Sequence, residues 1–69
     1  MANSTIENIK NNIKKYRIAC GLTQEKLGEI CKISPDYISE IERGRKIPSL
    51  KRLVIIAEAL NVTLGDLEK

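Results

Sequence analysis

Apolar residues recur at steps of three and four along most of the chain, which is the spacing of one face of an α-helix. Between these stretches lie short polar turns, and no stretch alternates in the way that predicts a strand. The pattern predicts helices over residues 5–20, 24–31, 35–43, 50–60 and 64–68. We therefore expect an all-α fold, a compact five-helix bundle formed by residues 1–69 as a single domain.

Capping signals set the expected helix starts. Ser4, with Glu7 three residues later, forms a capping-box pattern that starts the first helix near Thr5. Ser34 precedes Pro35, the combination preferred at the cap and first position of a helix. Thr63 caps the last helix with Asp66 in a second capping-box pattern. The expected helix ends carry residues that tolerate a left-handed backbone, namely Gly21, Gly44 and Asn61.

The same periodicity predicts which side chains are buried. In the first helix the expected stripe is Ile6, Ile9, Ile13, Tyr16 and Cys20. In the second and third helices it comprises Leu27, Ile30, Cys31, Ile38 and Ile41. In the fourth helix it comprises Leu50, Leu53, Val54, Ala57 and Leu60, which places Ile55 on the polar side.

Composition narrows the function classes. The net charge of +3 favours an anionic partner. The chain has two cysteines and no histidine, which excludes the usual Cys/His zinc spacings, so we expect no metal or cofactor. Cys20 and Cys31 are interpreted as buried apolar residues, with a redox role as the alternative. No apolar run could span a bilayer and the N-terminus does not resemble a signal peptide, so a cytoplasmic location is expected.

The central feature is a pair of short helices, 24–31 and 35–43, joined by a tight turn. Gly28 is the smallest residue in the first of them, and a small side chain there lets the second helix cross closely. Two short helices packed at a steep angle form a helix-turn-helix unit. The sequence therefore predicts this unit at the middle of the chain.

Several motifs occur in order around this unit: GLTQEKL at 21–27, IS at 33–34, YISEIERG at 37–44, PSL at 48–50 and LNVTL at 60–64. With these motifs the chain resembles the Cro/CI-type (XRE-type) helix-turn-helix family of phage repressors and bacterial regulators. The resemblance implies a lambda-repressor-like DNA-binding domain that inserts helix 35–43 into the major groove. Two positions depart from the family pattern: Lys32 stands where the turn usually has Gly, and Gly28 where Ala is common. A left-handed Lys32 would cost about 1 kcal/mol.

The resemblance also implies roles for individual residues. The positions facing base edges are Ser34, Pro35, Asp36, Ser39 and Glu40. The positions contacting the DNA backbone are Gln24, Tyr37, Arg43, Arg45 and Lys46. Glu42 is paired with Arg17 of the first helix, so that it positions helix 35–43 and does not face DNA.

Some of these positions have a second interpretation. Asp36 could complement the helix dipole and Glu40 could be a solvated charge, or either carboxylate could accept from cytosine N4. Tyr37 could be a core residue, and Arg43, Arg45 and Lys46 could be a plain solvated loop. Ile55 could be a solitary exposed residue, or could form a dimer patch with Val62, Leu64 and Leu67.

The function indicated is a sequence-specific double-stranded DNA-binding transcriptional regulator, a repressor acting as a homodimer on a pseudo-palindromic operator. The alternative is a protein-interaction module of the same fold, of the antitoxin or anti-repressor type. An enzyme is not indicated, because Glu40 and Glu42 point in different directions and no small-molecule substrate site is evident.

Overall fold

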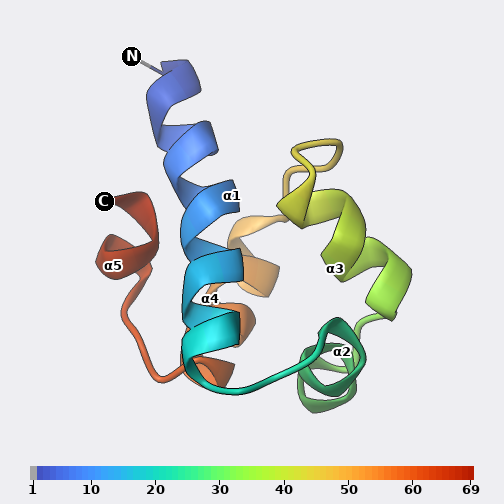
Figure 1. The fold of residues 1–69 in the computed structure, drawn as a ribbon. Helices are drawn as coiled ribbons and strands as arrows, with labels where there is room; N and C mark the ends of the chain where they lie inside the picture. The colour runs from blue at the N-terminus through green and yellow to red at the C-terminus, as the bar shows by residue number, and fades with distance from the viewer. Residues whose placement is uncertain (1) are drawn as a thin grey trace.

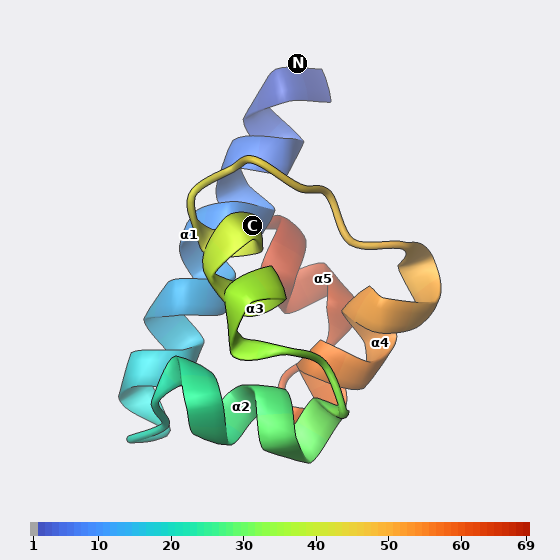
Figure 2. The ribbon, with the colours of Figure 1, turned by 90° about the vertical axis from the view of Figure 1, so that its right-hand side faces the viewer.

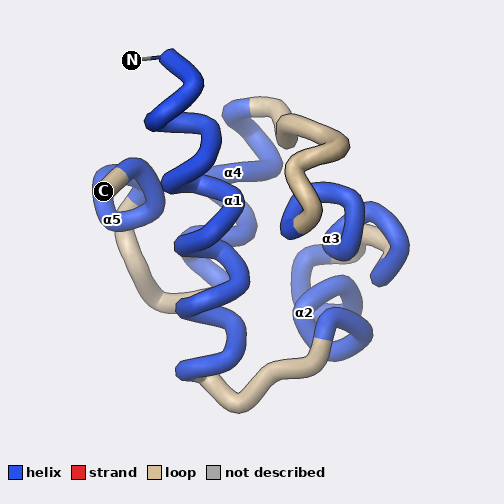
Figure 3. Tube along the Cα trace, turned by 45° about the horizontal axis from the view of Figure 1, so that its top comes forward, coloured by secondary structure: helices blue, strands red, loops and turns tan. Residues whose placement is uncertain are grey.

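The computed structural model describes residues 2–69, with side chains from Thr5 onward, and within them all regular secondary structure is helical (Figures 1 and 3). The helices are α1 (Ala2–Ala19), α2 (Gln24–Cys31), α3 (Pro35–Glu42), α4 (Leu50–Ala59) and α5 (Leu64–Glu68). α1 runs through the middle, with α5 on one side and the α2–α3 pair on the other (Figure 1). α2 also packs on α4, and α4 on α5. No helix in the described part of the chain is long and apolar enough to cross a membrane.

One cluster of buried apolar side chains holds all five helices together. Its fully enclosed members are Ile13, Leu27, Ile38, Ile41, Ile56 and Leu67. Full burial of such a side chain contributes roughly 1.5–3 kcal/mol by the hydrophobic effect. The predicted compact bundle is therefore confirmed, with its core centred between α1, α3 and α4.

The predicted buried face of α4 was partly wrong. Leu50 and Val54 are exposed, at 66% and 39%, whereas Ile56 is fully buried and Ile55 packs partly against the core. Residues 53–57 are all apolar, so no spacing of apolar and polar positions indicates which side of α4 is buried. The packing of α4 against α2 and α5 determines which side is buried.

Three other expected core residues also lie at the surface. Ile30 is 49% exposed and Ile6 38% exposed, and Cys20 is exposed with its Sγ 3.6 Å from Leu60 O. Ile30 lies in the last turn of α2, Cys20 follows the end of α1, and Ile6 lies in the N-terminal half of α1. Cys31 is buried as predicted, and its burial raises the pKa of the thiol.

α1 begins earlier than predicted, at Ala2 and not near Thr5. The backbone of residue 4 therefore lies inside the helix, and the Ser4 side chain, on which the predicted capping box depends, lies outside the described residues. Further along, α1 contributes two asparagines that were not singled out from the sequence. Asn12 Nδ2 donates to Leu67 O at 2.9 Å, and Asn8 Nδ2 to Glu68 O at 3.3 Å. These bonds satisfy carbonyls at the end of α5, which would otherwise have no helical partner.

The predicted caps at Ser34 and Thr63 are confirmed. Ser34 Oγ accepts from Tyr37 N at 3.1 Å. Thr63 and Asp66 form the reciprocal capping box, with bonds of 3.0 and 2.9 Å. The backbone N–H of Thr63, and then its hydroxyl, hold the pKa of the Asp66 carboxyl below its usual range.

α1 to α4 all end in the same way, with a left-handed residue after the last turn. At α2 this residue is Lys32, with φ 58° and ψ 42°. Its N–H donates to Glu29 O, and the next N–H, that of Ile33, donates to Gly28 O at 2.8 Å. These two bonds define a Schellman motif, in which Gly is the usual residue. Lys32 therefore holds a backbone conformation that a side chain disfavours.

We expect Lys32→Gly to stabilise the protein by about 0.5–1 kcal/mol, because glycine adopts the left-handed conformation without strain. Urea unfolding followed by circular dichroism measures the change. The matched control is Lys26→Gly inside α2, which should instead destabilise by about 1 kcal/mol. Equal effects of the two substitutions would show that Lys32 is not strained.

Gly28 sets the close packing of α2 against the turn. A Cβ at this position would lie 2.4 Å from Ile33 O and 3.3 Å from Pro35 N, both backbone atoms. Real Cβ atoms do not come this close to a carbonyl oxygen, so the turn would have to move to admit even alanine. The absence of a side chain at Gly28 thus fixes how closely α3 starts beside α2.

Candidate nucleic-acid interface

α3 presents one buried and one open side. Ile38 and Ile41 anchor it in the core, at 0% and 1% exposed. The predicted base-facing positions lie on the other side. Ser34, Pro35 and Asp36 are exposed, and Ser39 and Glu40 are half-buried. Figure 2 shows α3 at the front of the molecule, with α2 crossing below it.

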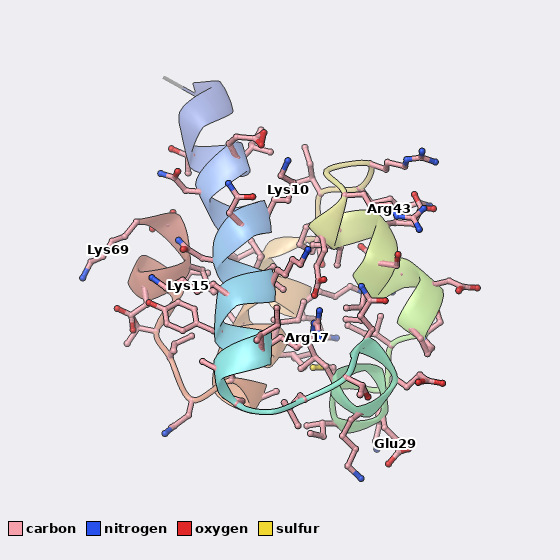
Figure 4. The ribbon with its side chains drawn as sticks, viewed as in Figure 1. Lys10, Lys15, Arg17, Glu29, Arg43 and Lys69 are labelled. Atoms are coloured by element: carbon pink, nitrogen blue, oxygen red, sulfur yellow. The ribbon has the colours of Figure 1, made fainter. Side chains whose placement is uncertain are left out.

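The loop after α3 carries three exposed cations, Arg43, Arg45 and Lys46. The backbone N–H groups of Arg45 and Lys46 both donate to Glu40 O, at 2.9 and 3.3 Å. These bonds fold the loop back over the end of α3, so the positive charges stay next to the helix. A Cβ at Gly44 would lie 3.0 Å from Lys10 Cδ, which shows that Lys10 of α1 packs on this loop. Figure 4 shows Lys10 and Arg43 on the same side of the molecule.

Glu42 points inward and forms a two-pronged ion pair with Arg17. Arg17 Nε lies 2.7 Å from Glu42 Oε2, and Arg17 Nη2 donates to Oε1 at 3.1 Å. The two side chains are only 11% and 4% exposed. Arg17 Nη1 also donates to Leu22 O at 2.7 Å, in the turn that leads into α2. The pair therefore joins α1, this turn and the end of α3, and Glu42 does not face the open side.

Gln24 is part of the same network, which the sequence did not reveal. Its Nε2 donates to Glu42 Oε1 at 3.1 Å, so the amide group is turned toward the ion pair. The predicted contact of Gln24 with the DNA backbone would have to use the amide atoms that Glu42 leaves free. This contact could not be predicted from sequence spacing, because Gln24 and Glu42 are 18 residues apart and meet only when the helices pack.

Tyr37 lies between the core and two cations. It is half-buried and packs against the core. Its ring also has two cations over it, with Arg52 Cζ 4.9 Å and Lys46 Nζ 6.0 Å from the ring centroid. Arg52, in the first turn of α4, had not been singled out from the sequence. The ring therefore links the start of α3 to the loop and to α4.

The predicted dimer patch was wrong at Leu67. This side chain is fully buried among the helices of its own chain, so it has no surface to offer a partner. Ile55, Val62 and Leu64 are half-buried and pack partly against the same core. Only Ile55 had been placed outside by periodicity; Leu67 belongs to α5, whose five residues are too few to define a buried face from the sequence.

Comparison with known proteins agrees with this geometry. The sequence profile of the helix-turn-helix family matches residues 13–67. The control protein C.SmaI of Serratia marcescens is 36% identical over 61 residues, covering 88% of this chain and 73% of its own. An uncharacterised HTH-type transcriptional regulator of Bacillus subtilis, YgzD, is 34% identical over 84% of this chain and 88% of its own.

A solved structure has the same fold over nearly its whole length. The restriction-modification controller protein C.AhdI of Aeromonas hydrophila superimposes with a TM-score of 0.84 at 27% identity, covering 97% of this chain and 98% of its own. The profile match spans both helices of the predicted unit and the core helices around it. The chain therefore belongs to the helix-turn-helix family, the Cro/CI-type family that its sequence motifs resemble.

Proposed function

We propose that this protein is a sequence-specific DNA-binding transcriptional regulator that places α3 in the major groove. The observation that carries the proposal is the two-sided character of α3. Its apolar side is locked into the core, while polar side chains lie on the open side next to three loop cations. A helix of this kind fits the width of the major groove, and the adjacent cations would meet phosphates.

The proposal extends to a homodimer that binds an inverted repeat in the cytoplasm and acts by binding without catalysis. The regulatory role is supported by family membership and by the names of the relatives, control proteins and a transcriptional regulator. Two-fold dimers of this kind place their half-sites about 34 Å apart or a multiple of that. In such a dimer, the single domain of residues 1–69 of each copy would bind one half-site.

The decisive experiment is selection of bound sequences from a library of random duplex DNA. We expect an enriched inverted repeat, whose affinity falls as salt concentration rises, with a log–log slope of roughly −0.9 per phosphate contact. If no duplex bound at any salt concentration, the proposal would fail. The alternative role as a protein-interaction module of the antitoxin or anti-repressor type would then be favoured.

Glu40 would contribute to sequence choice. Its carboxylate lies on the open side of α3 and forms no ion pair with any described residue. We expect Glu40→Gln to raise the affinity for random duplex and to relax the preference at one base pair per half-site by roughly 1–3 kcal/mol. Repeating the selection with this variant measures both effects. An unchanged preferred sequence and unchanged affinity would make Glu40 a bystander.

A further inference from the structure

Arg52 occupies an unusual position among the cations near α3. It is exposed in the first turn of α4, and its guanidinium lies over the ring of Tyr37, with Cζ 4.9 Å from the centroid. Tyr37 belongs to the first turn of α3. The stack therefore holds a positive charge from one helix directly beside the start of another, the one proposed to enter the groove.

Among the described residues, no partner accepts a hydrogen bond from the N–H donors of the Arg52 guanidinium. Within the described residues its side chain forms no ion pair and no hydrogen bond, since its only side-chain partner is the ring. Stacking engages the flat face of a guanidinium and leaves its in-plane N–H donors available. By contrast, each nitrogen of the Arg17 guanidinium donates one hydrogen bond, two of them to Glu42 and one to Leu22 O.

Lys46 adds a second charge to the same ring, with Nζ 6.0 Å from the centroid. Two cations thus share one aromatic ring with no carboxylate paired to either of them among the described residues. Such an arrangement favours an anion from outside the chain. A planar fork of N–H donors matches the oxygens of a phosphate group.

We propose that Arg52 is a phosphate-binding residue of the DNA interface and that the Tyr37 ring orients it. This inference rests on the proposed function and adds α4 to the surface that contacts the DNA backbone. Tyr37 then acts in two ways: it packs α3 against the core, and it holds the guanidinium with its N–H edge turned outward. Pre-orientation by stacking lowers the conformational entropy lost when the phosphate is bound.

The test compares Arg52→Ala with Lys51→Ala. Both residues are exposed neighbours in α4 and both substitutions remove one positive charge, but only Arg52 lies over the ring. Binding is measured by fluorescence anisotropy on a labelled random-sequence duplex and on the selected duplex, over a series of salt concentrations. We expect Arg52→Ala to weaken binding to both duplexes about tenfold and to reduce the salt slope by about one. Lys51→Ala should change the slope little.

The role of the ring is tested by a double-mutant cycle. In the Tyr37→Phe background the ring remains, and Arg52→Ala should still weaken binding about tenfold. In the Tyr37→Leu background the stack is lost, and the effect of Arg52→Ala should fall to about threefold. Circular dichroism melting of each variant separates these effects from loss of folding. Equal effects of Arg52→Ala in both backgrounds would overturn the orienting role of Tyr37.

Failure of this inference differs from failure of the proposed function. If the wild-type protein binds duplex DNA but Arg52→Ala and Lys51→Ala give the same affinity and slope, Arg52 holds no phosphate. If the wild-type protein binds no duplex at all, both proposals fall together.

Discussion

Replacing Glu42 by Gln should reduce the free energy of unfolding by about 3–5 kcal/mol. Gln keeps the shape of the side chain but removes its charge, so it leaves Arg17 as a buried cation with no counter-ion. Arg17 is 11% exposed and its Nε–Oε2 contact is 2.7 Å, so water cannot replace the lost partner easily. Urea unfolding followed by circular dichroism gives the change directly.

Two further variants test whether the loss of stability comes from the Arg17–Glu42 pair. Glu29→Gln removes the same charge from the exposed Lys26–Glu29 pair, whose side chains are 59% and 73% exposed, and should cost no more than about 0.5 kcal/mol. Replacing both partners, Arg17→Met with Glu42→Leu, should recover most of the lost stability, because no unpaired charge is left buried. If Glu42→Gln were as stable as the wild-type protein, the pair would not hold α3 in place.

Neutralising the basic loop should have the largest effect on DNA binding. The triple variant Arg43→Gln, Arg45→Gln and Lys46→Gln removes the exposed cations that follow α3. If each contacts one phosphate, the salt slope should fall by about 2.7, and the affinity for any duplex by roughly a hundredfold or more near physiological salt. Anisotropy titrations over a range of salt concentrations measure both quantities.

The control removes two positive charges from another part of the surface, with Lys15→Gln and Lys69→Gln. Figure 4 shows Lys15 and Lys69 on the side of the molecule turned away from Arg43. This variant should keep nearly the full salt slope, because net charge alone makes no phosphate contacts. A similar loss per removed charge in the loop variant and in this control would mean that the loop acts only through net charge.

Local features of the fold could be read from the sequence because they depend on residues within one turn of each other. The caps at Ser34 and Thr63 are of this kind, and both are present in the structure. The same holds for the left-handed position at Lys32, which follows from the position of the turn in the family pattern. Helix ends also fell within about one residue of prediction, except at the start of α1.

The buried side of a helix was harder to predict, because it depends on how that helix is rotated against its neighbours. Ile30, Leu50 and Val54 fit the expected stripes and are exposed, while Ile56 was not among them and is fully buried. A continuous apolar run is compatible with several rotations, and only packing against other helices selects one. The error at Leu67 arose because α5 has only five residues, too few to show a buried face.

By itself, the sequence determined the class of the protein: five helices, their boundaries except the start of α1, and the motifs that mark a helix-turn-helix unit. Only the tertiary structure decided the roles of Gln24 and Arg52. It turned the Gln24 amide toward Glu42, within the Arg17–Glu42 pair that the family resemblance had implied, and it placed Arg52 over Tyr37. Each of these pairs joins two different helices. Gln24 and Glu42 are 18 residues apart in the sequence, Arg17 and Glu42 are 25 apart, and Tyr37 and Arg52 are 15 apart. Side-chain spacing along one helix carries no information about such pairs, because they form only when separate helices pack together.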